Sequence, residues 1–217
     1  MEKASIQAPQ RIIFCDFDGT ITDQETAVAM MNQFAPEVAA KILPEIFAQR
    51  ISLKQGIREI WESIASCRYE EMIEVSRTKK IRPGFVELLD FVAEHNIHLV
   101  VVSGGLRCMI ETVLADLLDR VEAIYALDID LSGEYLRLAS EFTGETELLD
   151  KVKVIQQYQP EVAIAIGDSL TDLNMAMHVD IVFARSRLAQ YLDNRQKSYI
   201  PWNNFFDVIN YLTTHLN

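Results

Sequence analysis

The apolar positions of this chain follow two alternating patterns. Short apolar runs, rich in β-branched residues, are typical of strands buried on both faces of a parallel sheet. Such runs lie at residues 12–14, 97–102, 121–127, 162–166 and 181–184. Between them, apolar residues recur at helical spacing, which predicts connecting helices. Because strands that alternate with helices form βαβ units, the pattern predicts an α/β fold with a doubly wound parallel sheet.

One long stretch, residues 23–80, breaks this alternation, because its apolar residues have helical spacing throughout and include no strand-like run. Four helices are predicted in it. An all-helical stretch that follows the first strand predicts a separate small bundle beside the α/β core. We therefore assign residues 1–22 and 81–217 to the core domain and residues 23–80 to the helical domain.

Two further segments complete this outline. The alternating pattern of residues 128–142, around Ser132 and Gly133, predicts a β-hairpin. After the second strand-like run, Gly104 and Gly105 are expected to open the next helix.

Length and composition are those of an ordinary globular protein: 217 residues, 49% hydrophobic and 24% charged. The formal net charge of −12 argues against nucleic acid or an acidic membrane surface as a partner, because like charges repel. Small anionic substrates remain compatible, since cations within a site can reverse the local field. The three cysteines have no metal-ligand spacing and are typical of reduced thiols. The sequence shows neither a signal-like apolar segment nor a run of about 20 apolar residues. These features favour a cytoplasmic location.

The first strand-like run ends in two carboxylates, Asp16 and Asp18, which Gly19 follows. Ligands of parallel sheets gather outside the carboxyl ends of the strands, where this pair is expected to lie. If the strand geometry continues through the pair, both side chains point to one side. Two such carboxylates after an apolar strand are energetically costly unless a cation neutralises them. The pair therefore predicts a metal site.

Four short motifs follow one another along the chain. They are DFDGT at residues 16–20, Ser-Gly-Gly at 103–105, Lys151 and GDSLTD at 167–172. In this order they resemble the motifs of the haloacid dehalogenase superfamily of aspartyl-phosphate phosphatases. The resemblance implies a Rossmann-like core, Mg²⁺ as the cofactor, and a helical cap that closes over the active site and selects the substrate.

Mg²⁺ binds a few protein oxygens and completes its octahedron with water and substrate phosphate. Asp16 and Asp168 can each give one carboxylate oxygen, and the resemblance implies the backbone carbonyl of Asp18 as a third ligand. Asp172 lies one helical turn after Asp168. It is better placed to accept a hydrogen bond that orients Asp168 or a metal-bound water.

The resemblance also implies a reaction in two steps. Asp16 is the expected nucleophile, which attacks phosphorus and forms an aspartyl-phosphate that water then hydrolyses. Asp18 is the expected general acid for the leaving alcohol and the general base for the attacking water.

Phosphate esters need their negative charge compensated during transfer. Thr20, Ser103 and the Gly104 amide are assigned to the phosphoryl oxygens, and a lysine is assigned to the developing charge. Lys151 and Lys153 compete for that role. We favour Lys151, because the helical pattern places it at the start of its helix, facing the ligand edge of the sheet, and places Lys153 on the surface.

Two branches of the superfamily compete for the substrate. Glu25 and Arg58 resemble the glutamate and arginine that phosphoserine phosphatases use for the substrate amine and carboxylate. The segments MMNQFAP at 30–36, ISLKQGI at 51–57 and VFAR at 182–185 resemble the bacterial phosphatases of methionine salvage instead.

The favoured prediction is a phosphomonoesterase of the methionine salvage branch, which acts on a small-molecule phosphate ester. Phosphoserine phosphatase is the alternative within catalysis. From another class, a non-catalytic phosphate-binding module on the same fold is a remote alternative, because competent residues fill every catalytic position.

Overall fold

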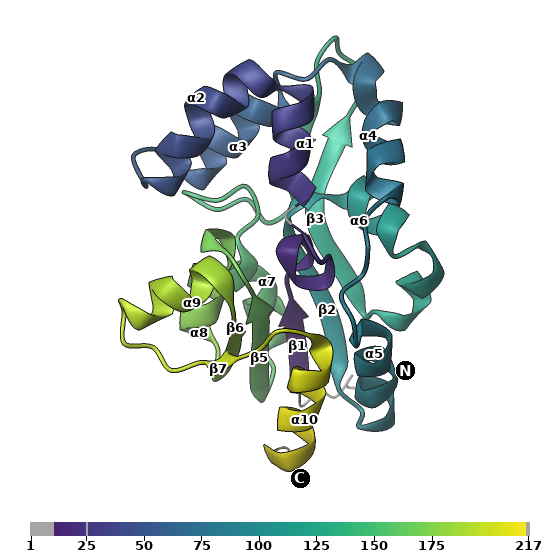
Figure 1. Ribbon diagram of the computed structural model, residues 1–217, viewed down its shortest axis with the longest axis vertical. Coiled ribbons are helices and arrows are strands. Elements are labelled where there is room, and N and C mark those ends of the chain that lie inside the picture. The colour runs from purple at the N-terminus through teal and green to yellow at the C-terminus, as the bar shows by residue number, and fades with distance from the viewer. Residues whose placement is uncertain (1–10, 25, 216–217) are drawn as a thin grey trace, which may run out of the picture.

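The computed structural model describes residues 11–24 and 26–215, and it places a group of helices over one end of an α/β core (Figure 1). The core is built on a seven-stranded sheet of order β4-β3-β2-β1-β5-β6-β7. Neighbouring strands are parallel except for the β3–β4 pair. The predicted doubly wound parallel sheet and the predicted hairpin are confirmed. The strands are β1 (Arg11–Cys15), β2 (His98–Leu106), β3 (Ala123–Asp130), β4 (Arg137–Ala139), β5 (Val162–Gly167), β6 (Ile181–Ala184) and β7 (Ile200–Pro201).

Strand β1 lies at the centre of the sheet and is buried on both faces. Ile12 and Phe14 belong to one apolar cluster, and Ile13 and Cys15 belong to a second cluster on the opposite face. This is the burial that a continuous apolar run predicts. The first cluster includes residues of α7 (Lys151–Tyr158), α8 (Leu173–His178) and α9 (Ser186–Asp193), and the second includes residues of α5 (Phe85–Glu94) and α10 (Phe205–His215).

The Ser-Gly-Gly segment differs from its prediction. Strand β2 continues through it to Leu106, and helix α6 (Arg107–Val113) begins one residue later. The pairing of β2 with β3 shifts register between Val102 and Leu106. Within the shift, the Gly105 amide donates to Ser103 Oγ at 3.0 Å. The two glycines therefore form an irregular end of the strand and do not open the helix.

Residues 26–80 contain four α-helices, as their periodicity predicts: α1 (Thr26–Phe34), α2 (Pro36–Phe47), α3 (Leu53–Trp61) and α4 (Tyr69–Arg77). They lie at the end of the sheet toward which β1 points (Figure 1). Met30 and Ile60 of these helices belong to the same apolar cluster as Val102 and Val154 of the core. We call residues 23–80 the cap, and their separation as a domain stays a prediction.

The segment between β3 and β4 reaches the cap and is hydrogen-bonded to it. The Ser66 amide donates to the Glu134 carbonyl at 2.9 Å, and the Leu136 amide donates to the Ile64 carbonyl at 3.0 Å. These two bonds attach the cap, at Ile64 and Ser66, to the β3–β4 segment of the core. Among the described residues, no helix has the length and apolar character to cross a lipid bilayer.

Candidate active site

The first motif forms a tight turn directly after β1. The chain folds into a single helical turn at Phe17–Ile21, inside which Gly19 has φ +78°. A side chain is strained in this conformation. A Cβ on Gly19 would also lie 2.6 Å from Asp168 Oδ2. Gly19 is therefore required both for the turn and for the close approach of the first motif to the fourth.

A buried arginine, Arg82, holds this turn in place. Its guanidinium donates to the carbonyls of Gly19 at 2.7 Å, Thr20 at 2.8 Å and Thr22 at 3.0 Å. Burial lowers the pKa of Arg82, with the charge of Arg185 acting in the same direction. Arg82 was missed in the sequence, where only its position before Pro83 marks it, and no local pattern reveals a contact with a loop about 60 residues away.

Lys151 is the centre of a buried charge network. Its Nζ donates to Asp16 Oδ1 and to Asp172 Oδ1, both at 2.6 Å, and its side chain is 1% exposed. Asp150 caps the helix, since its Oδ1 accepts from the amides of Val152 at 3.1 Å and Lys153 at 3.2 Å. These bonds from the N-cap residue fix the first turn of α7, so that Lys151 points toward the edge of the sheet.

The network shifts the protonation of its members. Burial by itself lowers the pKa of Lys151, but Asp16 and Asp172 outweigh it and raise that pKa above its ordinary value. Burial and the charge of Asp172 raise the pKa of Asp16 to about 7, although Lys151 opposes this. Lys153 is exposed and donates to the Thr143 carbonyl at 2.8 Å. Of the two candidate lysines, Lys151 is thus the one that contacts the carboxylates.

Three buried carboxylates converge at this edge of the sheet. Asp16, Asp168 and Asp172 each offer one oxygen, and these oxygens all lie within 4.8 Å of one another. Both oxygens of Asp172 already accept bonds: Oδ1 from Lys151, and Oδ2 from the amides of Asp168 and Ser169 at 3.0 Å each. Asp172 therefore has the contacts of an orienting residue, while Asp16 and Asp168 are close enough to share one ion.

The charge balance of this cluster fits a divalent cation. Three carboxylates face one ammonium group, which leaves net negative charge in a buried place. The available donors are carboxylate oxygens, which hard cations such as Mg²⁺ prefer. Thr20 is fully buried, and its Oγ1 donates to Asp168 Oδ1 at 3.4 Å. Thr20 thus contacts the carboxylate cluster and is not among the residues that line the pocket described next.

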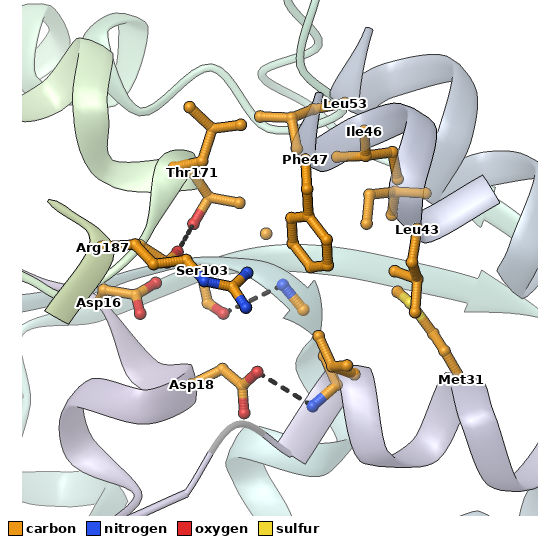
Figure 2. Close-up of a pocket in the computed structure, with 17 residues that line it drawn as sticks. Asp16, Asp18, Met31, Leu43, Ile46, Phe47, Leu53, Ser103, Thr171 and Arg187 are labelled. Atoms are coloured by element: carbon orange, nitrogen blue, oxygen red, sulfur yellow. Dashed lines mark hydrogen bonds between the residues drawn. The ribbon is translucent and has the colours of Figure 1, made fainter. Parts of the chain in front are cut away.

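A pocket that opens to solvent lies between the carboxylates and the cap, and the space free of protein atoms in it, open solvent included, is about 740 Å³. Figure 2 shows its two unlike sides. Its polar side carries Asp16, Asp18, Ser103, Gly104 and Thr171, and its apolar side carries Val28, Met31, Leu43, Ile46, Phe47 and Leu53 from the cap. A ligand held here meets reactive carboxylates at one end and aliphatic and aromatic side chains at the other.

Asp18 joins the two sides of the pocket. Its carboxylate accepts from the backbone amides of Thr26 and Ala27, the second at 3.0 Å. These amides belong to the first turn of α1, whose donors have no partner within the helix. The first cap helix therefore starts on a carboxylate of the core motif.

Two residues are predicted to select the substrate, and the structure describes one of them. Glu25 lies outside the described residues. Arg58 pairs with Glu62 at 3.1 Å, and Arg58 is not among the described residues that line the pocket. The lining instead includes Arg187 of α9, which was missed, because its position in the sequence suggests only an exposed helix charge.

Known proteins resemble this chain over most of its length. The sequence profile of the haloacid dehalogenase-like hydrolases matches residues 13–177. A 2-hydroxy-3-keto-5-methylthiopentenyl-1-phosphate phosphatase of Microcystis aeruginosa is 47% identical over 204 residues, which cover 93% of this chain and 97% of the relative. A phosphatase of the same name from Bacillus thuringiensis (strain Al Hakam) is 34% identical over 208 residues, covering 90% and 93%.

Solved structures share the fold. Phosphoserine phosphatase from T. onnurineus, in complex with NDSB-201, superposes with a TM-score of 0.73 over 97% of this chain and 98% of that chain, at 16% identity. At that identity the likeness concerns the fold alone. The family profile, the extent of the identity and the shared fold agree with the motifs around Asp16. The chain belongs to the haloacid dehalogenase-like hydrolases.

Proposed function

We propose that this phosphatase hydrolyses 2-hydroxy-3-keto-5-methylthiopentenyl-1-phosphate with Mg²⁺ as its cofactor. One relative with this name is 47% identical and covers 93% of the chain. Another is 34% identical and covers 90% of it. The single observation that carries the proposal is the two-sided pocket, with carboxylates at one end and an apolar wall at the other.

The chemistry of this ester matches the two sides. Its phosphate, on the first carbon, requires the nucleophile Asp16 and the donors Ser103 and Gly104. Its methylthio group, on the fifth carbon, is apolar and suits contact with Met31, Leu43 and other apolar residues of the cap. Phosphoserine is charged at the end opposite its phosphate, and an apolar wall disfavours such a group.

Asp16 and Asp168, with the carbonyl of Asp18, are the proposed ligands of Mg²⁺. When bound, the ion supplies charge neutralisation for the phosphoryl oxygens and for the carboxylates themselves. Asp172 keeps Asp168 in place through the Asp168 amide, and it shares Lys151 with Asp16. Lys151 therefore compensates charge on the nucleophile from the side of the protein interior.

The proposed reaction has two displacements at phosphorus. In the first, a carboxylate oxygen of Asp16 bonds to phosphorus, the ester oxygen leaves, and Asp18 gives that oxygen a proton. In the second, water attacks phosphorus, its proton passes to Asp18, and the bond to Asp16 breaks. Ser103 and the Gly104 amide bind phosphoryl oxygens in both steps, and Thr20 supports Asp168.

The test combines one variant with a substrate panel. In the presence of Mg²⁺, the wild type should release phosphate from the methionine salvage ester with a kcat/KM at least tenfold above those for phosphoserine and phosphoethanolamine. Asp16→Asn should abolish turnover of every ester. The control Asp130→Asn changes an exposed carboxylate of the β3–β4 hairpin and should keep full activity.

Three outcomes contradict the proposal. Persistent turnover by the Asp16→Asn variant, with its fold intact by circular dichroism, moves the nucleophile elsewhere. A higher kcat/KM for phosphoserine supports the phosphoserine phosphatase alternative and requires a role for Arg58 that its pairing with Glu62 does not suggest. A wild type that binds phosphate and turns over no ester supports the non-catalytic alternative.

A further inference from the structure

Arg187 is a charged residue of the pocket that the proposed mechanism does not use. It lies in the first turn of α9, and its guanidinium carbon is 4.2 Å from the centre of the Phe47 ring, which belongs to α2 of the cap. Figure 2 shows its side chain extending between the carboxylate side of the pocket and Phe47. Arg187 therefore reaches from the core to the cap across the space where a substrate must lie.

The guanidinium has unused hydrogen-bonding capacity. Within residues 11–24 and 26–215, no hydrogen bond or ion pair engages it, and its contact is with the face of the Phe47 ring. A guanidinium carries five N–H donors in a planar fork, and stacking on a ring leaves the donors at its edge available. The fork is thus available to oxygens of a ligand in the pocket.

The backbone of Arg187 is held relative to the carboxylate cluster. The amide of the next residue, Leu188, donates to the Asp168 carbonyl at 2.8 Å, and Leu188 and Leu192 are fully buried. Helix α9 is therefore tied directly to the fourth motif. A side chain that starts from such a fixed point loses less conformational entropy when it binds a ligand.

We propose that Arg187 is the specificity-determining residue that binds the oxygen-bearing middle of the substrate, with Phe47 supporting its guanidinium. This inference rests on the function proposed above. The ester carries a hydroxyl and a keto oxygen on adjacent carbons, between its phosphate and its methylthio group. The phosphate has its own donors in Ser103 and Gly104, and the methylthio end meets the apolar cap. Two neighbouring oxygens in between suit a planar fork of two donors.

The test compares two esters that differ in these oxygens. One is the methionine salvage ester, and the other is n-pentyl phosphate, which has a phosphate on a five-carbon chain and no further oxygen. The measured quantity is the ratio of their kcat/KM values. Arg187→Gln should lower this ratio on the order of 10- to 100-fold, because one or two charge-assisted hydrogen bonds are lost for the first ester alone.

A matched control and a double-mutant cycle sharpen the test. Arg195→Gln removes an exposed guanidinium just beyond the same helix, which donates to the Tyr191 carbonyl, and should leave the ratio unchanged. Phe47→Leu keeps an apolar side chain but removes the ring face, so it should lower the ratio severalfold. In the Arg187→Gln background, Phe47→Leu should have little further effect on the ratio, because the guanidinium that it supports is gone.

The outcomes separate this inference from the proposed function. If Arg187→Gln keeps the wild-type ratio within twofold, the inference is wrong, and an equal fall for both esters would mean that Arg187 contacts the phosphate. If the wild type itself does not prefer the salvage ester over n-pentyl phosphate, the proposed function fails, and the inference fails with it. Thermal melting of each variant shows whether its fold is intact.

Discussion

Replacement of Lys151 by methionine is the sharpest test of the buried charge network. Methionine has a similar shape but no charge, so Asp16 and Asp172 would each lose a bond of 2.6 Å and remain buried with no ammonium beside them. Removing one partner of a buried ion pair costs about 3–5 kcal/mol. We expect a loss of this size in the free energy of unfolding at pH 8 with EDTA present, measured by urea denaturation.

The pH dependence has a definite sign. An unfolded aspartate has a pKa of about 3.9, whereas burial and Asp172 raise the pKa of Asp16 to about 7 in the folded protein. The folded state then binds more protons, so metal-free stability falls as the pH rises through the folded pKa of Asp16. Without Lys151 that pKa rises further, and the deficit of the variant should be smaller at pH 6 than at pH 8.

Lys151 itself does not titrate in this interval, because the two aspartates raise its pKa above its ordinary value. Its stabilising effect is therefore fully present in the wild type at pH 6 and at pH 8. If the loss of unfolding free energy in Lys151→Met differs between the two pH values, the difference reports on the titration of Asp16. The matched control is Lys153→Met, which changes an exposed lysine of the same helix and should cost less than about 0.5 kcal/mol. A deficit below 1 kcal/mol for Lys151→Met at pH 8 in EDTA would refute the reasoning.

Two further changes test the first motif turn. Gly19→Ala places a Cβ 2.6 Å from Asp168 Oδ2 at a residue whose φ is +78°. The rate of phosphate release should therefore fall at least tenfold, and the free energy of unfolding should fall by about 1–3 kcal/mol. The control Gly133→Ala, where the nearest atom is 3.5 Å from the added Cβ, should be nearly neutral. Arg82→Met leaves three carbonyls without their donor and should lower the free energy of unfolding by about 3 kcal/mol in urea. The surface change Arg77→Met should cost less than about 0.5 kcal/mol, and an equal cost for both arginines would show that the turn needs no anchor.

The sheet could be predicted because its central strands are buried on both faces. A strand such as β5 (Val162–Gly167) must be apolar at nearly every position, and this leaves a continuous run in the sequence. Strand β7 left no such run, because it is two residues long and contains Pro201. The extension of β2 was also missed, since its irregular end depends on a register shift against β3 that has no local pattern.

The reactive end of the site was visible for a related reason. Asp16, Asp18 and Asp168 each follow a buried strand closely, and parallel strands bring their carboxyl ends to one edge. Arg82 and Arg187 gave no comparable signal, because each reaches its partners across the fold: Arg82 to the first motif turn and Arg187 to a ring of the cap. Such contacts depend on the tertiary structure, so a single sequence marks them only as ordinary charges.

The difference between these two groups of residues reflects how the pocket is built. The core supplies the polar side, where glycines, buried carboxylates and Lys151 fit one another so closely that few substitutions are sterically or electrostatically tolerated. The cap supplies an apolar wall, where several aliphatic side chains satisfy the same physical need. The residues proposed for catalysis therefore lie in short sequence motifs, while those proposed for substrate choice are dispersed and resemble ordinary core residues. Asp18 links the two, because a displacement of α1 must either break its bonds to the amides of Thr26 and Ala27 or move Asp18 with the helix. The position of the cap and the placement of the proposed acid are thus mechanically coupled.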